Sequence, residues 1–149
     1  MLNVGKIEEG IVLDHIEAGK AMLIYHYLHL DREEYPVAII KNARSNEMGK
    51  KDILKVECDP DKINLDAVAF MKPQITVNVI KGGEIVEKKV MKAPREIRGV
   101  LKCHNPRCIT SIEQGLQHIF FLSDARRGIY RCRYCEERYS AGDLEKRYR

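Results

Sequence analysis

The sequence predicts an α+β protein with two domains, and three patterns support this prediction. The first two thirds of the 149 residues alternate between strand-like and helix-like segments. Pro94 interrupts the last of these segments, and the charge changes there. Residues 1–94 carry 14 Lys and Arg against 15 Asp and Glu, whereas residues 95–149 carry 12 against 7. The second segment also holds four of the five cysteines. We therefore expect domains of residues 1–94 and 95–149.

Hydrophobic periodicity assigns the elements of the first domain in order. Residues 9–14 are apolar at most positions and predict a buried strand, and residues 17–28 place apolar side chains at three- and four-residue steps, as in a helix. Two further strands are expected at 35–40 and 51–57. A second helix is expected from Asp59 to Met71, because Asp59 can cap it and Pro60 suits its first turn.

The last two predicted strands of this domain, residues 74–80 and 84–90, are separated by Gly82-Gly83. Two glycines between alternating strands indicate a hairpin, because both turn residues often need positive φ. The order β-α-β-β-α-β, with one added hairpin strand, is that of the ferredoxin-like fold. Such a sheet has one face free of helices. The fold supports many functions and specifies none.

The four cysteines of the second domain form two pairs, Cys103-x4-Cys108 and Cys132-x2-Cys135. Four thiolates in two short loops are the usual ligands of a closed, structural Zn²⁺ site, which leaves no position for a substrate. Disulfides are the less favoured alternative. No apolar signal region or membrane-spanning run is present, so we expect a cytoplasmic protein with reduced thiols. In so small and β-rich a domain, one zinc ion replaces much of the core.

Catalytic motifs do not stand out in this sequence, but two features of the first domain have alternative interpretations. Lys51, Ile53 and Lys55 share one face of a strand and could bind a polyphosphate; taken alone, they are better explained as solvated lysines of an edge strand. Asp14, at the end of the first strand, could face a ligand, but the residues alone favour a place in the cap of the following helix.

The second domain has a basic segment with a similar ambiguity. Arginines at 126, 127, 131 and 133 alternate with Tyr130 and Tyr134, a composition compatible with nucleic-acid binding. Aromatic residues beside a zinc site more often fill its small core. A zinc-ribbon nucleic-acid-binding protein is therefore the alternative function.

Four blocks of sequence, taken together, carry a resemblance to a known family. They are Gly10-Ile11-Val12-Leu13-Asp14-His15-Ile16, Asn46-Glu47-Met48-Gly49-Lys50-Lys51-Asp52, Pro73-Gln74-Ile75-Thr76-Val77-Asn78 and the cysteine pairs ending in Cys132-Arg133-Tyr134-Cys135-Glu136. In this combination and order, spanning nearly the whole chain, the sequence resembles the regulatory chains of aspartate carbamoyltransferase.

The resemblance implies a non-enzymatic subunit in pyrimidine biosynthesis. Its N-terminal allosteric domain would bind ATP, CTP or UTP, and its zinc domain would contact the catalytic chain. Regulatory-chain homodimers would bridge catalytic trimers in a dodecamer of six catalytic and six regulatory chains, with no nucleic-acid or membrane partner. The implied nucleotide contacts are Asp14, His15, Lys51, Ile53, Lys55, Asn78, Ile80, Ile85, Lys88 and, from the N-terminal segment, Val4, Lys6 and Ile7.

One position departs from the family pattern. Gly83 stands where many relatives carry an aromatic residue after the hairpin turn. A ring contact is therefore absent, and the role of Lys88 depends on the register of this hairpin.

Overall fold

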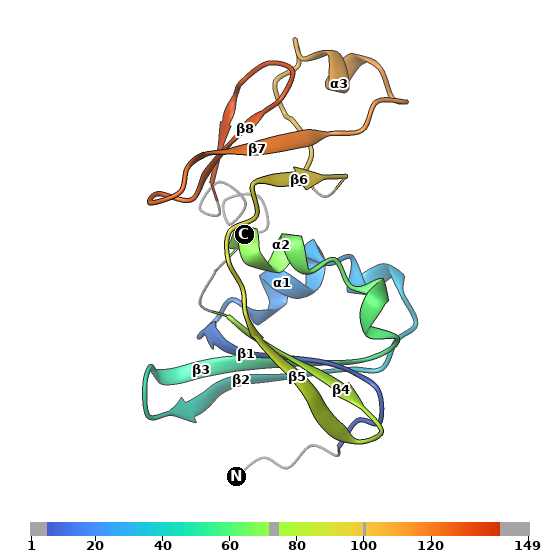
Figure 1. The fold of residues 1–149 in the computed structure, drawn as a ribbon, viewed down its shortest axis with the longest axis vertical. Coiled ribbons are helices and arrows are strands. Elements are labelled where there is room, and N and C mark those ends of the chain that lie inside the picture. The colour runs from blue at the N-terminus through green and yellow to red at the C-terminus, as the bar shows by residue number, and fades with distance from the viewer. Residues whose placement is uncertain (1–5, 72–74, 100, 141–149) are drawn as a thin grey trace. The chain divides into compact units, whose positions relative to one another are not determined.

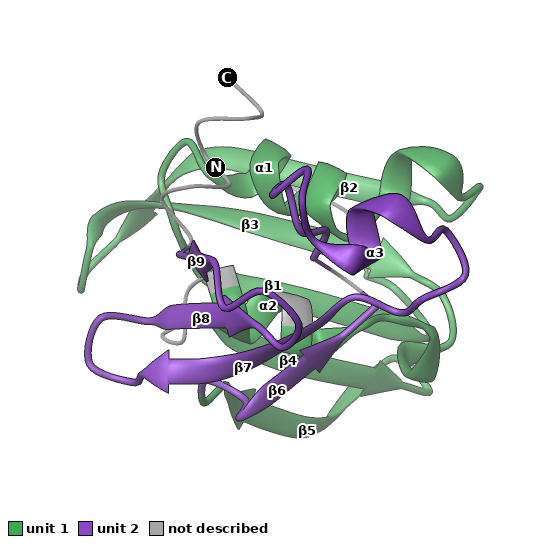
Figure 2. Ribbon diagram, turned by 90° about the horizontal axis from the view of Figure 1, so that it is seen from above, with its two compact units in different colours: residues 1–92 green, residues 93–149 purple. Residues whose placement is uncertain are grey.

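The computed structural model describes residues 6–71, 75–99 and 101–140 of the chain. The chain divides into two compact units, Met1–Lys92 and Ala93–Arg149, which Figure 2 colours separately. Strands outnumber helices in both, and the α+β class expected from the sequence is confirmed.

The first unit is built on a five-stranded antiparallel sheet with the order β2-β3-β1-β4-β5. Figure 1 shows its two helices together on one side of this sheet. The order is that of the ferredoxin-like fold with β5 added at one edge, as predicted. The elements are β1 (Gly10–Glu17), α1 (Ala21–Tyr27), β2 (Val37–Ser45), β3 (Gly49–Glu57), α2 (Leu65–Met71), β4 (Thr76–Lys81) and β5 (Glu84–Val90), with 3₁₀ turns at Leu30–Arg32 and Pro60–Lys62.

The core of this unit lies between the sheet and the helices. Successive side chains of a strand point to opposite faces, so every second residue of β1, β3 and β4 can be buried. The register places Leu13 between Leu54 and Val77, all fully buried. It also places Val12 between Lys55 and Asn78, on the opposite face. This helix-free face, with its charged and amide side chains, is called the open face below.

Both helices of the first unit are shorter than the sequence predicted. β1 continues through a bulge to Glu17, and Gly19, at φ +92°, turns the chain before α1 begins. The predicted second helix is split in two. Asp59 accepts a hydrogen bond from the Asp61 N–H at 3.0 Å, but this caps only a 3₁₀ turn, and the extended residue Ile63 separates that turn from α2.

One side chain on β3 joins three segments of this unit. Asp52 is fully buried, and one of its carboxylate oxygens accepts the N–H groups of Gly19 and Ala21 at 3.0 and 3.1 Å. The other oxygen accepts the N–H of Asn42 at 3.0 Å, where β2 is also bulged. A helix begins with unpaired N–H groups that a carboxylate stabilises. Asp52 therefore supplies, from a distant strand, the cap that α1 lacks locally.

The second unit is a four-stranded antiparallel sheet with the order β6-β7-β8-β9 and one helical turn. Its core includes Ile97, Phe120 and Tyr130, each at most 1% exposed, and the Tyr130 hydroxyl donates a hydrogen bond to the Pro94 carbonyl. The elements are β6 (Glu96–Arg98), α3 (Ile109–Ile112), β7 (Ile119–Asp124), β8 (Ile129–Cys132) and β9 (Arg138–Tyr139).

We predict that Asp52→Ala destabilises the first unit by about 3 kcal/mol, because it leaves three N–H groups without their acceptor. Urea unfolding of the zinc-loaded protein, followed by circular dichroism, measures this. The control is Asp31→Ala at an exposed site, which should change the stability by less than about 0.5 kcal/mol. Equal stabilities of the two variants would contradict the structural role of Asp52.

Candidate functional site

Four cysteine sulfurs gather in the second unit. Those of Cys103, Cys108, Cys132 and Cys135 all lie within 4.8 Å of one another. Two of the Sγ–Sγ distances are 3.5 Å, between Cys103 and Cys135, and 3.7 Å, between Cys108 and Cys132. A disulfide needs about 2.05 Å, so the thiols are not bonded. Tetrahedral Zn²⁺, with Zn–S bonds of about 2.3 Å, requires sulfurs about 3.8 Å apart.

The protein groups around these sulfurs suit a buried metal. The hydroxyl groups of Thr110 and Tyr139 lie 3.0 Å from Cys108 Sγ and 3.6 Å from Cys103 Sγ. Burial raises the pKa of the Cys103 thiol to about 12. Burial acts in the same direction on Cys108, but hydrogen bonds from Thr110 outweigh it and lower the pKa of Cys108 to about 7. A divalent cation shared by four sulfurs supplies the charge that stabilises all of them as thiolates.

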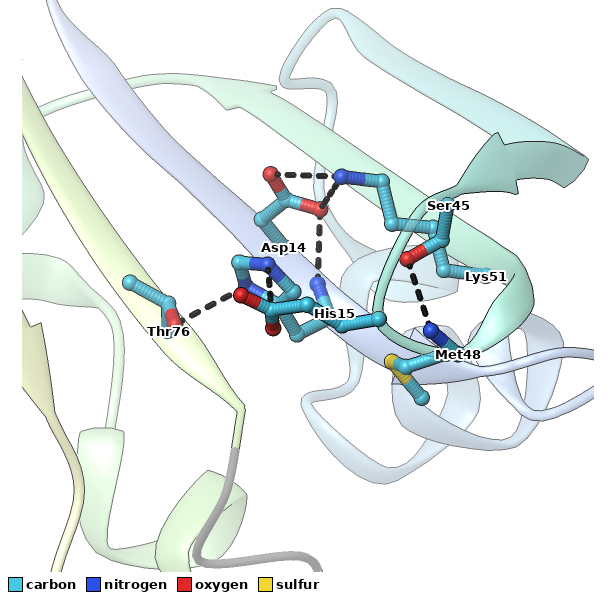
Figure 3. Close-up of polar contacts among 7 residues, drawn as sticks. Asp14, His15, Ser45, Met48, Lys51 and Thr76 are labelled. Carbon is cyan, nitrogen blue, oxygen red and sulfur yellow. Dashed lines mark hydrogen bonds and ion pairs between the residues drawn. The ribbon is translucent and has the colours of Figure 1, made fainter.

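The predicted nucleotide residues of β1 and β3 meet on the open face. Lys51 Nζ lies 3.0 Å from Asp14 Oδ1 and 3.3 Å from Oδ2, and both side chains are less than a quarter exposed. Burial alone would raise the pKa of Asp14, but hydrogen bonds from Lys51 and from the backbone N–H of His15 lower it overall. Asp14 thus holds the Lys51 ammonium at this face (Figure 3).

The bulge in β1 orients His15. This residue has φ +60°, a backbone angle that is uncommon for residues other than glycine. Such residues are concentrated at functional sites. Its Nδ1 lies 3.0 Å from Thr76 Oγ1 on β4 (Figure 3). Its Nε2 lies 3.8 Å from a Glu47 carboxylate oxygen in the β2–β3 turn. Asp14 and His15 both lie within β1, which continues to Glu17. The interpretation of Asp14 as part of the cap of the following helix is therefore wrong.

Three further predicted residues form one row across the sheet together with Val12. Lys55, Val12, Asn78 and Lys88 are direct neighbours on β3, β1, β4 and β5. Asn78 is 9% exposed, and its Oδ1 is buried without a hydrogen-bond partner among the described residues. An unpaired buried acceptor costs free energy. Its presence is therefore typical of a binding site in which the ligand supplies the hydrogen-bond donor. β3 lies inside the sheet, hence the edge-strand explanation of its lysines is wrong.

The remaining predicted residues lie around this row. Ile80 pairs with Gly10 and Ile85, and Ile85 is 62% exposed on β5. Gly82 and Gly83 both have positive φ, and the N–H of Gly83 donates to the Glu8 carbonyl at 2.9 Å, which fixes the hairpin beside the N-terminal segment. Within that segment Lys6 is exposed and Ile7 is half-buried, and Val4 lies outside the described residues.

The structure also brings in residues that the sequence analysis missed. Thr76 and Val12 belong to the open face, and their alternation with Asn78 and Asp14 was the available signal. A concavity of about 710 Å³ continues from the predicted site along β2. It includes Lys51 and Ile53 but otherwise consists of Ile40, Lys41, Asn42, Ala43 and Arg44, which no motif had indicated.

Comparison with known proteins agrees with both halves of this arrangement. Residues 2–92 match the family model of the allosteric domain of the aspartate carbamoyltransferase regulatory chain, and residues 95–145 match that of its metal-binding domain. The chain belongs to the family of aspartate carbamoyltransferase regulatory chains. The resemblance seen in the sequence is therefore confirmed.

Curated relatives extend over almost the whole chain. The regulatory chain of Clostridium botulinum is 47% identical over 146 residues, which cover 98% of this chain and 99% of the relative. Those of Clostridium tetani and Bifidobacterium longum are 42% and 44% identical, covering 93% and 91% of this chain and 96% and 97% of the relatives. As a regulatory chain of this enzyme, the protein has the catalytic chain as its partner. No helix among the described residues could span a membrane.

The metal-binding domain and the cysteine cluster together identify a structural zinc site. We predict that Cys132→Ser lowers the zinc content far below one ion per chain and unfolds the second unit, because three of its buried apolar side chains are these cysteines. Metal analysis and hydrogen exchange of the full chain measure the two effects. Cys58→Ser, outside the cluster, should keep both zinc and protection. A zinc-free variant that remains protected in residues 101–140 would contradict a structural role.

Proposed function

We propose that this chain is a non-catalytic, nucleotide-sensing subunit of aspartate carbamoyltransferase in pyrimidine biosynthesis. It binds ATP, CTP and UTP through residues 1–94 and the catalytic chain through residues 95–149, and as a homodimer it bridges catalytic trimers in a dodecamer of six catalytic and six regulatory chains. Reduced thiols are required for its zinc site, and we therefore assign it to the cytoplasm.

The observation that carries this proposal is the convergence of ligand-type groups on the open face. Lys51, Lys55 and Lys88 come from two strands that lie on either side of β1 and β4, and all three are predicted contacts. Ammonium groups bind phosphates as point charges. The aliphatic side chains between them offer an apolar floor for a base, and Asn78 Oδ1 can accept a base N–H. One surface therefore offers cations for the triphosphate, an apolar floor for the base and an acceptor for a base N–H.

The alternative function, nucleic-acid binding by the zinc unit, loses part of its support. It depended on arginines that alternate with Tyr130 and Tyr134. Tyr130 is 1% exposed and fills the core, so it cannot stack on a base, whereas Tyr134 is 46% exposed. One exposed ring does not form a stacking platform for successive bases.

We predict that Lys51→Ala weakens ATP binding by about tenfold or more, since a charge-assisted hydrogen bond to phosphate is worth about 1.5–3 kcal/mol. Adenosine binding should change little. Isothermal titration of both ligands measures this, and Lys55→Ala should behave alike. The control is Lys50→Ala, an exposed neighbour on the same strand that is not a predicted contact. Equal weakening of adenosine and ATP by Lys51→Ala would withdraw the phosphate assignment.

We also predict that the two functions separate within the full chain. Lys51→Ala should keep its affinity for the catalytic chain, and the assembled enzyme should need at least about tenfold more ATP for the same response. Cys132→Ser should keep nucleotide binding and lose the catalytic chain. Allostery requires two distinct sites, and each variant impairs one of them. Analytical ultracentrifugation with the catalytic chain and assays of the complex with ATP and CTP measure this. Loss of nucleotide binding in Cys132→Ser would contradict the division of labour.

A further inference from the structure

One buried hydroxyl group reaches from one cysteine pair of the second unit to the other. Tyr139 lies on β9, shortly after Cys135, and is only 8% exposed. Its ring packs edge-on against that of Phe120, with the ring centroids 5.2 Å apart. Its hydroxyl oxygen lies 3.6 Å from Sγ of Cys103, which belongs to the first pair. The core of the unit therefore fixes this hydroxyl beside a metal ligand.

A second contact directs the proton of the Tyr139 hydroxyl toward the sulfur. The backbone N–H of His104 donates a hydrogen bond to the Tyr139 oxygen at 2.7 Å. A tyrosine hydroxyl can accept one hydrogen bond while it donates another. The His104 N–H, the Tyr139 hydroxyl and Cys103 Sγ therefore form a chain in which each group donates to the next. Hydrogen bonds in such a chain strengthen one another in a buried environment.

The backbone of Cys103 is held as well as its sulfur. Its N–H donates to His118 Nδ1 at 3.0 Å, and its carbonyl accepts a hydrogen bond from the Ser111 hydroxyl at 3.2 Å. Ser111 lies in α3 and His118 directly precedes β7, so these contacts come from two further segments. Tyr139 adds a contact from β9 that acts on the sulfur itself. Distant segments thus place the first cysteine of the site.

The charge of the site explains why a donor at this sulfur matters. Four thiolates around one Zn²⁺ carry two negative charges in excess, and here most of the ligands are buried. Partners that donate hydrogen bonds to metal ligands orient them and adjust their basicity. The Thr110 hydroxyl, 3.0 Å from Cys108 Sγ, is one such partner. Burial raises the pKa of the Cys103 thiol, and the hydrogen bond from Tyr139 opposes this effect.

We propose that Tyr139 is a positioning residue of the zinc site, whose hydroxyl donates a hydrogen bond to the Cys103 thiolate and slows the loss of zinc. The proposal adds a residue to the structural zinc site and does not depend on nucleotide binding by the first unit. Removal of a partner that hydrogen-bonds a metal ligand typically lowers metal affinity about 10–100-fold. Because folding of such a small unit is coupled to metal binding, Tyr139 determines how long the unit stays folded when free zinc is scarce.

The test compares Tyr139→Phe with Tyr134→Phe in the zinc-loaded full chain. Tyr139→Phe keeps the buried ring and removes its hydroxyl. Tyr134→Phe, the control, removes an exposed hydroxyl from the loop between Cys132 and Cys135. A coloured chelator in excess withdraws the zinc, and its absorbance gives the rate of zinc loss. We expect Tyr139→Phe to lose zinc at least about tenfold faster than the original chain, and Tyr134→Phe to stay within about twofold of it.

An absorption spectrum separates a hydrogen bond to the sulfur from a merely structural role of Tyr139. Co²⁺, which binds the same ligands, gives sulfur-to-metal charge-transfer bands. A hydrogen bond lowers the energy of the sulfur lone pair, so its loss should shift these bands to longer wavelength. We expect this shift in Tyr139→Phe and in Thr110→Val, which removes the hydroxyl beside Cys108 at nearly constant volume. Thr110→Ser keeps a hydroxyl, and it should leave the bands in place, as should Tyr134→Phe.

Two results would overturn the proposal. If Tyr139→Phe and Tyr134→Phe lose zinc at the same rate, the hydroxyl does not retain the metal. If Tyr139→Phe loses zinc faster but its charge-transfer bands stay in place, the hydroxyl acts only as the acceptor for the His104 N–H. Should Tyr139→Phe fail to fold, NMR of the original chain loaded with cadmium replaces it. A scalar coupling between the metal and the Tyr139 hydroxyl proton is expected, and a resolved hydroxyl proton without this coupling contradicts the proposal. None of these results bears on nucleotide binding, so the proposed function is tested separately.

Discussion

A carboxylate that is removed from water must receive hydrogen bonds, and this requirement shapes the first unit around Asp52. Its donors come from the turn before α1, from the first turn of that helix and from the bulge in β2. The neighbouring residue, Lys51, faces the other side of the sheet and pairs with Asp14, which lies at the bulge of β1. The bulged strands β1 and β2 and the first turn of α1 are thus all held to β3. The ligand-type side chains on the open face depend on that arrangement.

The second unit is subject to a different constraint, because it is too small for a large hydrophobic core. Among the described residues of this unit, three of the nine buried apolar side chains are cysteines, and the remainder include Ile97, Phe120 and Tyr130. So small a core contributes little hydrophobic stabilisation. Zinc coordination adds the stabilisation that so small a core cannot provide, and it does not require a longer chain. The surface of these short strands and turns can then carry many charged side chains, among them Arg126, Arg131 and Arg138.

The sequence predicted those features that depend on short-range pattern. Alternation along β3 placed Lys51 and Lys55 on one face, and the spacing of the cysteines predicted their cluster, whereas Asn78 and Ile80 came only from the resemblance to the family. What it missed depends on contacts between distant segments. The cap of α1 comes from Asp52, which is 31 residues from the N–H of Ala21 that it accepts, so no local signal marked where the helix begins. Likewise, the positive φ of His15 belongs to a bulge whose register is set by the partner strand.

The Asp14–Lys51 pair bears on how the proposed sensor would work. A phosphate that approaches Lys51 must compete with a carboxylate already 3.0 Å away, and the repulsion between that carboxylate and the phosphate opposes binding. Part of the Coulomb energy of the lysine is therefore not available to the nucleotide. A sensor benefits from this loss, because it must release its ligand when the concentration falls. A ligand also shifts a conformational equilibrium only by its difference in affinity between two states. The Lys51 ammonium can pair with either Asp14 or a phosphate, so the affinity for the nucleotide depends on how close Asp14 lies to Lys51. Any movement that separates Asp14 from Lys51 therefore favours the nucleotide-bound state.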